Sequence, residues 1–372
     1  MVVVLKVVVL RNKSFLVSLM VLEALLVLSD VSILSSAKIL LVCSLQVIAG
    51  SRLVEKFFYR RQLETLERYG LGLPVGVAIS ICFDQLFLKS AISSFAWLIP
   101  LILTITFCRL KVSTDSIVKS VPTFSDLEMA VWLTIGVLAI LGQEWFWPMP
   151  VSMFFAFAAA IWFKYIFANK DSRIRNQITI AFLVAGISAL VFGLFIRPFS
   201  WWIEDSDFGF YEAFTVSLSR WGTSENLLSA GAGFRYHWFV YEWSGLVSKV
   251  ASLPSWVMLT RGVVVIGAFS LASSIWSIIK RVNIGQRSTI FCLLIVCFFD
   301  SVTSWGAGFR IGFVSSPSQM IGFIWLFAIL LVILDKDLQK ISLSPLLFSI
   351  LFSGAILSKV SHGVVEIGRA HV

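Results

Sequence analysis

Long runs of apolar residues, separated by short polar stretches rich in lysine and arginine, make up most of this chain. A helix that crosses a hydrocarbon core of about 30 Å needs roughly 17 to 25 apolar residues, and about eleven runs approach or reach that length. The pattern therefore predicts an all-α, polytopic integral membrane protein. The predicted spans are 14-29, 32-50, 70-88, 92-109, 127-147, 150-168, 177-197, 254-279, 288-303, 319-335 and 341-359.

Basic residues gather in every second connection between these spans, for example in residues 52–68 and 164–175. If the N-terminus is cytoplasmic, all of these connections face the cytoplasm, as the positive-inside rule requires. The same alternation places the long polar loop 198-253 on the extracytoplasmic side. Trp202 and Trp256 at the edges of this loop then lie at the outer interface, where indole rings are favoured.

The composition agrees with this class of protein. Only 14% of the residues are charged and 58% are hydrophobic, whereas soluble proteins carry about 25% charged residues. In a membrane protein the net charge of +9 reflects basic cytoplasmic loops, so we expect no nucleic-acid partner. The five cysteines lie inside apolar runs without zinc spacing, and no nucleotide-binding, zinc-protease or serine-hydrolase motif occurs. We expect a plasma or inner membrane location.

Charged residues inside or beside the spans cost free energy to bury in the membrane, so each is a candidate for a structural or functional role. Glu23 and Lys38 lie at equal distances from a predicted turn, which favours a structural ion pair over a substrate or proton site. Asp84 is expected to reach the interface from the outer end of its span. Arg261 lies about two turns into its span, where a functional and a structural role are equally open. Segment 51-69 is basic and amphipathic, which predicts a cytoplasmic interfacial helix.

The long outer loop contains the chain's one concentrated set of candidate chemical groups. Glu204, Asp205 and Asp207 follow a predicted membrane exit. Apolar residues at helical spacing then predict a short amphipathic helix on the membrane surface, with Asp207 as N-cap and Gly222 as its stop. A carboxylate there is well placed to meet a polar head group, although capping the helix is an alternative role.

From Asp207 onward the chain resembles the C-type fold membrane glycosyltransferases, in particular the protein-mannosyltransferase and aminoarabinose-transferase branch. The resemblance covers roughly residues 180 to 285. Phe208 replaces a family Glu, and a Pro-Pro pair is missing. The matching features are the intervals between Asp207, Tyr211 and Gly222, the strip Arg235-Tyr236-His237-Trp238, and Arg261 in the following span.

The resemblance implies transfer of a sugar from a polyprenyl-phosphate donor to an acceptor on the outer face. Asp207 would be the catalytic base, with Asp205 as second candidate, because an acceptor hydroxyl must lose its proton. Arg261 or Arg235 would hold the lipid phosphate. His237 would orient the acceptor, join a carboxylate in holding a divalent cation, or simply be hydrogen-bonded. The candidate substrate-binding residues are Glu204, Tyr211, Arg235, Tyr236, His237 and Arg261.

The predicted organisation has an N-terminal transmembrane module, 1-176, of about six helices, followed by the glycosyltransferase-like core, 177-365. The final residues, 366-372, resemble a translated sequencing adapter. We therefore expect that the natural part of this sequence ends near Val365 and that the natural protein continues beyond that point. The expected partners are the lipid bilayer and a polyprenyl-phosphate-linked sugar.

Three other functions fit the same pattern of spans and loops. A lipid-linked polysaccharide polymerase or ligase also uses a long outer loop, but usually with several arginines. A transporter would be expected to show internal repeats with broken spans, and none is evident. A noncatalytic membrane protein would keep the fold alone.

Overall fold

The computed structural model describes residues 13–59, 62–90, 92–108, 207–225, 236–282, 317–335 and 344–358, together with Gly231 and Gly233. It is mostly helical (88%) and has no strand in these ranges, which agrees with the all-α prediction. The predicted spans 127-147, 150-168, 177-197 and 288-303 lie outside the described residues, as does the segment 366-372.

Three helices are long and apolar enough to cross a membrane, namely Ile33–Tyr59, Thr65–Phe87 and Ser255–Ile275. This supports the coarser prediction of a helical membrane protein; the number of spans and their orientation remain predictions. The helices are α2 (Lys13–Leu28), α3 (Ile33–Leu53), α4 (Thr65–Glu67), α5 (Leu73–Phe87), α6 (Ile99–Cys108), α11 (Asp207–Trp221), α12 (Phe239–Ala251), α13 (Ser255–Val257), α14 (Val263–Val282), α16 (Pro317–Ile333) and α17 (Ser344–Ser358).

Segment 51-69 differs from the separate interfacial helix that its amphipathic pattern predicts. The α3 helix continues through a π-helical turn, Val54–Tyr59, and the chain then folds back. Glu55 explains this path, because its fully buried carboxylate accepts hydrogen bonds from Arg52 and Arg68, each at 3.2 Å. A buried charge that is paired twice holds the turn inside the bundle rather than on a lipid surface.

A second ionic cluster joins three helix ends on the same side of the bundle. Arg281, at the end of α14, contacts Glu67 of α4 at 2.7 Å and Asp335, just after α16, at 3.0 Å. Its guanidinium also donates to the Tyr59 hydroxyl at 3.2 Å. This cluster therefore fixes the relative positions of α3, α4, α14 and α16.

The predicted Glu23–Lys38 ion pair is wrong. Glu23 accepts a hydrogen bond from the Ser36 hydroxyl at 2.6 Å, and Lys38 donates to the Ser252 hydroxyl at 3.3 Å. Equal depth on two antiparallel helices does not set the rotation of either helix about its axis. Each charged side chain therefore forms a hydrogen bond with a serine hydroxyl group on the side of its helix to which it points.

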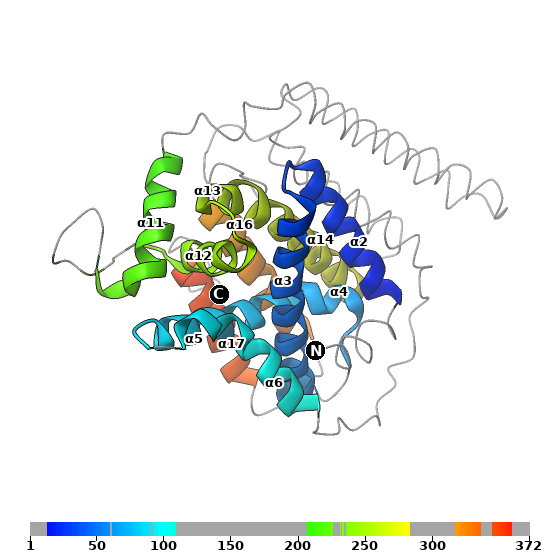
Figure 1. Cartoon of the computed structure of the whole chain (residues 1–372). Coiled ribbons are helices and arrows are strands. Elements are labelled where there is room, and N and C mark those ends of the chain that lie inside the picture. Colours follow the sequence, from blue (N-terminus) through cyan, green and yellow to red (C-terminus); the bar gives the residue numbers. More distant parts are fainter. Residues whose placement is uncertain are drawn as a thin grey trace, which may run out of the picture.

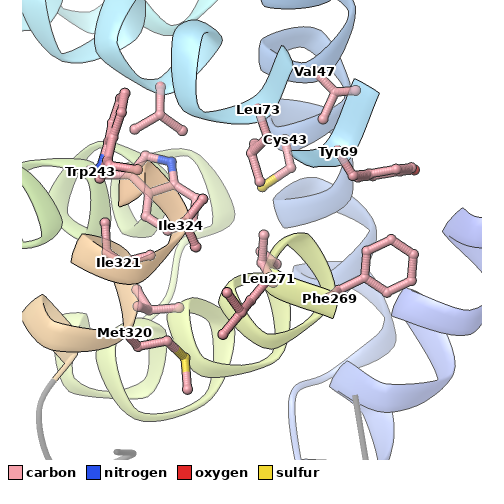
Figure 2. Close-up of a cluster of buried hydrophobic side chains, with 14 of the residues drawn as sticks. Cys43, Val47, Tyr69, Leu73, Trp243, Phe269, Leu271, Met320, Ile321 and Ile324 are labelled. Carbon is pink, nitrogen blue, oxygen red and sulfur yellow. The ribbon is translucent and has the colours of Figure 1, made fainter. Parts of the chain in front are cut away.

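The core lies where α3, α5, α12, α14 and α16 meet (Figure 1), and Figure 2 shows side chains from all five elements pointing into it. The α12 helix comes from the predicted outer loop, yet nearly all of its residues are buried. Trp243 anchors it, since its indole N–H donates to the buried Gln46 side chain at 3.1 Å, and Gln46 donates to Ser80 at 3.1 Å. These bonds connect α12 to α3 and α5.

Replacing Gln46 with leucine should lower the free energy of unfolding by about 1–3 kcal/mol, because the Trp243 N–H is left buried without an acceptor. Chemical unfolding in detergent micelles measures this loss. In a double-mutant cycle, Trp243→Phe should cost much less when Gln46 is already leucine than in the native chain. Strictly additive costs would contradict the hydrogen-bonded connection.

Candidate functional site at α11 and α12

The α11 helix has nearly the limits of the predicted amphipathic helix, but Asp207 is its first helical residue and not the N-cap before it. It begins at Asp207, and a 3-10 turn that starts at Gly222 follows it. Gly222 has a φ of +69°, a conformation that favours glycine and explains the stop. One face of the helix packs on protein: Thr215 and Leu218 are fully buried, and a Cβ added at Gly245 of α12 would lie 2.9 Å from Ser219.

Five rings from α11, from α12 and from the residues just before α12 pack together; we call Tyr211, Phe214, Tyr236, His237 and Tyr241 the ring cluster. Tyr211 stacks on Tyr241 with centroids 5.4 Å apart, and Tyr236 stacks on Tyr241 at 6.2 Å. His237 lies against Tyr236 at 3.6 Å, and Phe214 contacts Tyr236 at 5.3 Å. The structure thus brings together three of the predicted site residues, Tyr211, Tyr236 and His237.

The ring cluster reaches from the interior to the surface. Tyr241 is fully buried, whereas Tyr236 is 42% exposed. Phenol and imidazole rings combine a flat apolar face with a hydrogen-bonding edge. Such a set can hold a flat, partly polar ligand at its exposed end. The sequence analysis missed Phe214 and Tyr241 as members, although both belong to helical patterns of aromatic residues.

Arg261 contacts a different part of the protein. It lies in the π-helical turn Met258–Gly262, donates to the Asp30 carbonyl oxygen at 3.1 Å, and stands over the Trp256 ring at 5.4 Å from its centroid. The bond to Asp30 connects this π-helical turn to the turn between α2 and α3. The phosphate-binding role remains a proposal. The other candidates, Glu204, Asp205 and Arg235, lie outside the described residues.

Two carboxyl groups that the sequence analysis did not connect meet at the base of this region. Asp84, near the end of α5, is 2% exposed, and Glu242, in the first turn of α12, is fully buried. The expectation that Asp84 reaches the interface is therefore wrong: α12 covers it. No local pattern links the two residues, because the chain between them is long and only the packing of α12 on α5 brings them together.

Burial and the neighbouring Asp84 raise the pKa of Glu242 well above the usual carboxyl value. The Gln85 side chain and Lys249 act in the opposite direction and favour the charged form. Gln85 also accepts a hydrogen bond from the Thr223 backbone N–H at 3.3 Å. The carboxyl pair and the end of α11 are therefore parts of one packed region.

The described residues contain no group of three or more His, Cys, Asp or Glu side chains that could hold a metal ion. Neither a scan against protein-family models nor searches of curated proteins and solved structures found a match. The functional assignment therefore depends on the residues themselves.

Proposed function

We propose that this chain is a membrane glycosyltransferase that moves a sugar from a polyprenyl-phosphate donor to an acceptor at the α11 and α12 end of the bundle. One observation carries the proposal. Tyr211, selected by its interval from Asp207, lies in one ring cluster with Tyr236 and His237, selected from the strip before α12, beside the helix that begins at Asp207. The cluster joins two separate parts of the family resemblance.

In the proposed reaction the acceptor hydroxyl oxygen attacks the anomeric carbon of the donor sugar. The bond between that carbon and the phosphate oxygen breaks, and polyprenyl phosphate leaves with the electron pair. Asp207 takes the hydroxyl proton, with Asp205 as the alternative base. Arg261 or Arg235 stabilises the departing phosphate, since a guanidinium pairs with two phosphate oxygens.

The remaining candidates position the substrates in this proposal. The exposed end of the ring cluster, at Tyr236 and His237, receives the sugar or the acceptor through ring faces and polar edges. Glu204 would accept hydrogen bonds from sugar hydroxyls. A divalent cation held between His237 and a carboxylate would add a further contact to the phosphate.

Replacing Asp207 with asparagine should lower sugar transfer at least about 100-fold, because the amide keeps the shape of the side chain but cannot accept the proton. Transfer from a radiolabelled polyprenyl-phosphate sugar in isolated membranes measures the effect. Protein abundance should be unchanged, since asparagine has the same shape as aspartate and is also well tolerated at the start of a helix.

Asp207→Ala and Asp205→Asn complete this experiment. If Asp207 only supports the helix start, the asparagine variant keeps full activity, and the alanine variant loses about 1 kcal/mol of stability. Loss of activity in Asp205→Asn alone would move the base two residues upstream. Full activity in both asparagine variants would rule out the proposed mechanism.

A further inference from the structure

The Asp84 and Glu242 carboxyl groups meet in a sealed part of the bundle, between the end of α5 and the start of α12. One oxygen of Asp84 and both oxygens of Glu242 are buried without a hydrogen bond of normal geometry. Buried polar atoms of this kind are rare in folded proteins and call for an explanation. The proposed sugar transfer uses neither residue, so this feature stands apart from it.

Neither carboxyl group forms an ion pair with a cation in the described part of the chain. Lys249, which acts on Glu242, donates a hydrogen bond to the Ser219 carbonyl oxygen at 2.6 Å. The charged side chains on the described elements around α12 are Lys38 and Arg52 on α3, Lys89 just after α5, Glu212 and Arg220 on α11, Lys249 on α12 itself, and Arg261 in the adjoining π-helical turn. Of this set only Lys249 acts on Glu242, and it acts more weakly than Asp84.

The titratable rings His237 and Tyr241 belong to the ring cluster. The helices α16 and α17 carry no charged residue at all.

A metal ion is also a poor explanation for these oxygens. Calcium takes six to eight oxygen ligands, and magnesium keeps several waters. The pair offers two carboxyl groups and the Gln85 amide in a position closed to solvent. A proton, unlike a metal ion, can bind between two carboxyl oxygens without further ligands or a cavity. Two adjacent buried carboxyl groups that cannot both ionise commonly share one.

We propose that Asp84 and Glu242 form a proton-binding site, in which one shared proton lets α12 pack against α5. With the proton in place, one carboxyl group can donate to the other, and the pair carries a single negative charge, which the Gln85 amide and Lys249 favour. Without it, two like charges face each other in a sealed interior. The contact that carries Tyr241 and Trp243 into the bundle is then weakened.

Infrared spectroscopy of the full chain in lipid tests the protonated state directly. At neutral pH we expect a carbonyl band of a protonated carboxylic acid, which shifts with solvent deuteration and is lost at high pH. Glu242→Gln and Asp84→Asn should each remove this band, because an amide replaces one member of the pair. Glu225→Gln changes an exposed glutamate and should leave the band unchanged.

The pH dependence of thermal unfolding supplies a second readout. Glu242 has a higher pKa in the folded chain than in the unfolded one, so the folded chain binds more protons between those two values. Stability should therefore fall as pH rises from the ordinary carboxyl range near 4.5 through the folded pKa. Glu242→Gln should flatten this slope, whereas Glu225→Gln should keep it.

Two results would overturn the proposal. One is a neutral-pH spectrum of the native chain with no protonated carboxyl band. The other is a stabilisation by sodium or calcium ions that Glu242→Gln abolishes, because it would place a metal ion between the carboxylates. The spectrum of the native chain decides the matter even if one variant fails to fold, and neither result bears on sugar transfer by Asp207.

Discussion

Replacing Arg281 with methionine should lower the free energy of unfolding by about 3–5 kcal/mol. The guanidinium pairs with Glu67 and Asp335, and these three side chains are only 9% to 13% exposed. Methionine fills similar space but leaves two carboxylates uncompensated at a buried helix junction. Chemical or thermal unfolding in detergent micelles at neutral pH measures the loss.

Two further variants separate the loss of pairing from the loss of an arginine. Arg220→Met removes an exposed arginine and should change stability by less than about 0.5 kcal/mol. Adding Glu67→Gln and Asp335→Asn to Arg281→Met should recover much of the stability, because the orphaned charges are gone. A triple variant that is less stable than Arg281→Met would contradict an electrostatic cause.

Replacing Gly76 with alanine should destabilise the chain by about 3 kcal/mol or more, because the added methyl group meets backbone rather than a flexible side chain. A Cβ at this position would overlap the Gln46 carbonyl group and lie 2.8 Å from the Gln46 Cα. Added Cβ atoms at Gly50 and Gly72 would overlap the facing backbone or side chain in the same way. The α3 helix and the α5 segment therefore cross with their backbones in contact, as small-residue motifs permit in membranes.

Gly209→Ala is the matched control, since Gly209 also lies in a helix but has nothing within 4 Å of its added Cβ. Alanine is the better helix former by about 1 kcal/mol, so this variant should be neutral or slightly more stable. Equal destabilisation by Gly76→Ala and Gly209→Ala in unfolding experiments would show that the close crossing is not the cause.

Several expectations from the sequence describe the structure well, and their physical basis is local. Apolar runs of sufficient length predicted the helices, because a helix satisfies its own backbone and needs only an apolar surface. The start of α11 at Asp207 and its end at Gly222 followed from helical spacing and from a residue that tolerates a positive φ.

The expectations that failed depended on how helices rotate and on what covers them. Glu23 and Lys38 were correctly judged to be on neighbouring helices, but hydrogen bonds to Ser36 and Ser252 replace the expected pair. A basic amphipathic pattern in 51-69 resembles that of a surface helix. Glu55 is nevertheless buried in the bundle, where one of its ion-pair partners is Arg68, a residue beyond the π-helical turn.

By itself, the sequence determined the helical class, the membrane character and the approximate limits of most helices in the described ranges, because these depend on length, apolarity and the conformational range of single residues. Only the tertiary structure decided that α12 is buried, that Arg281 joins three helix ends, and that Asp84 meets Glu242. Each of these contacts joins segments far apart in the chain, and the energy of a buried charge depends on partners that no local pattern specifies.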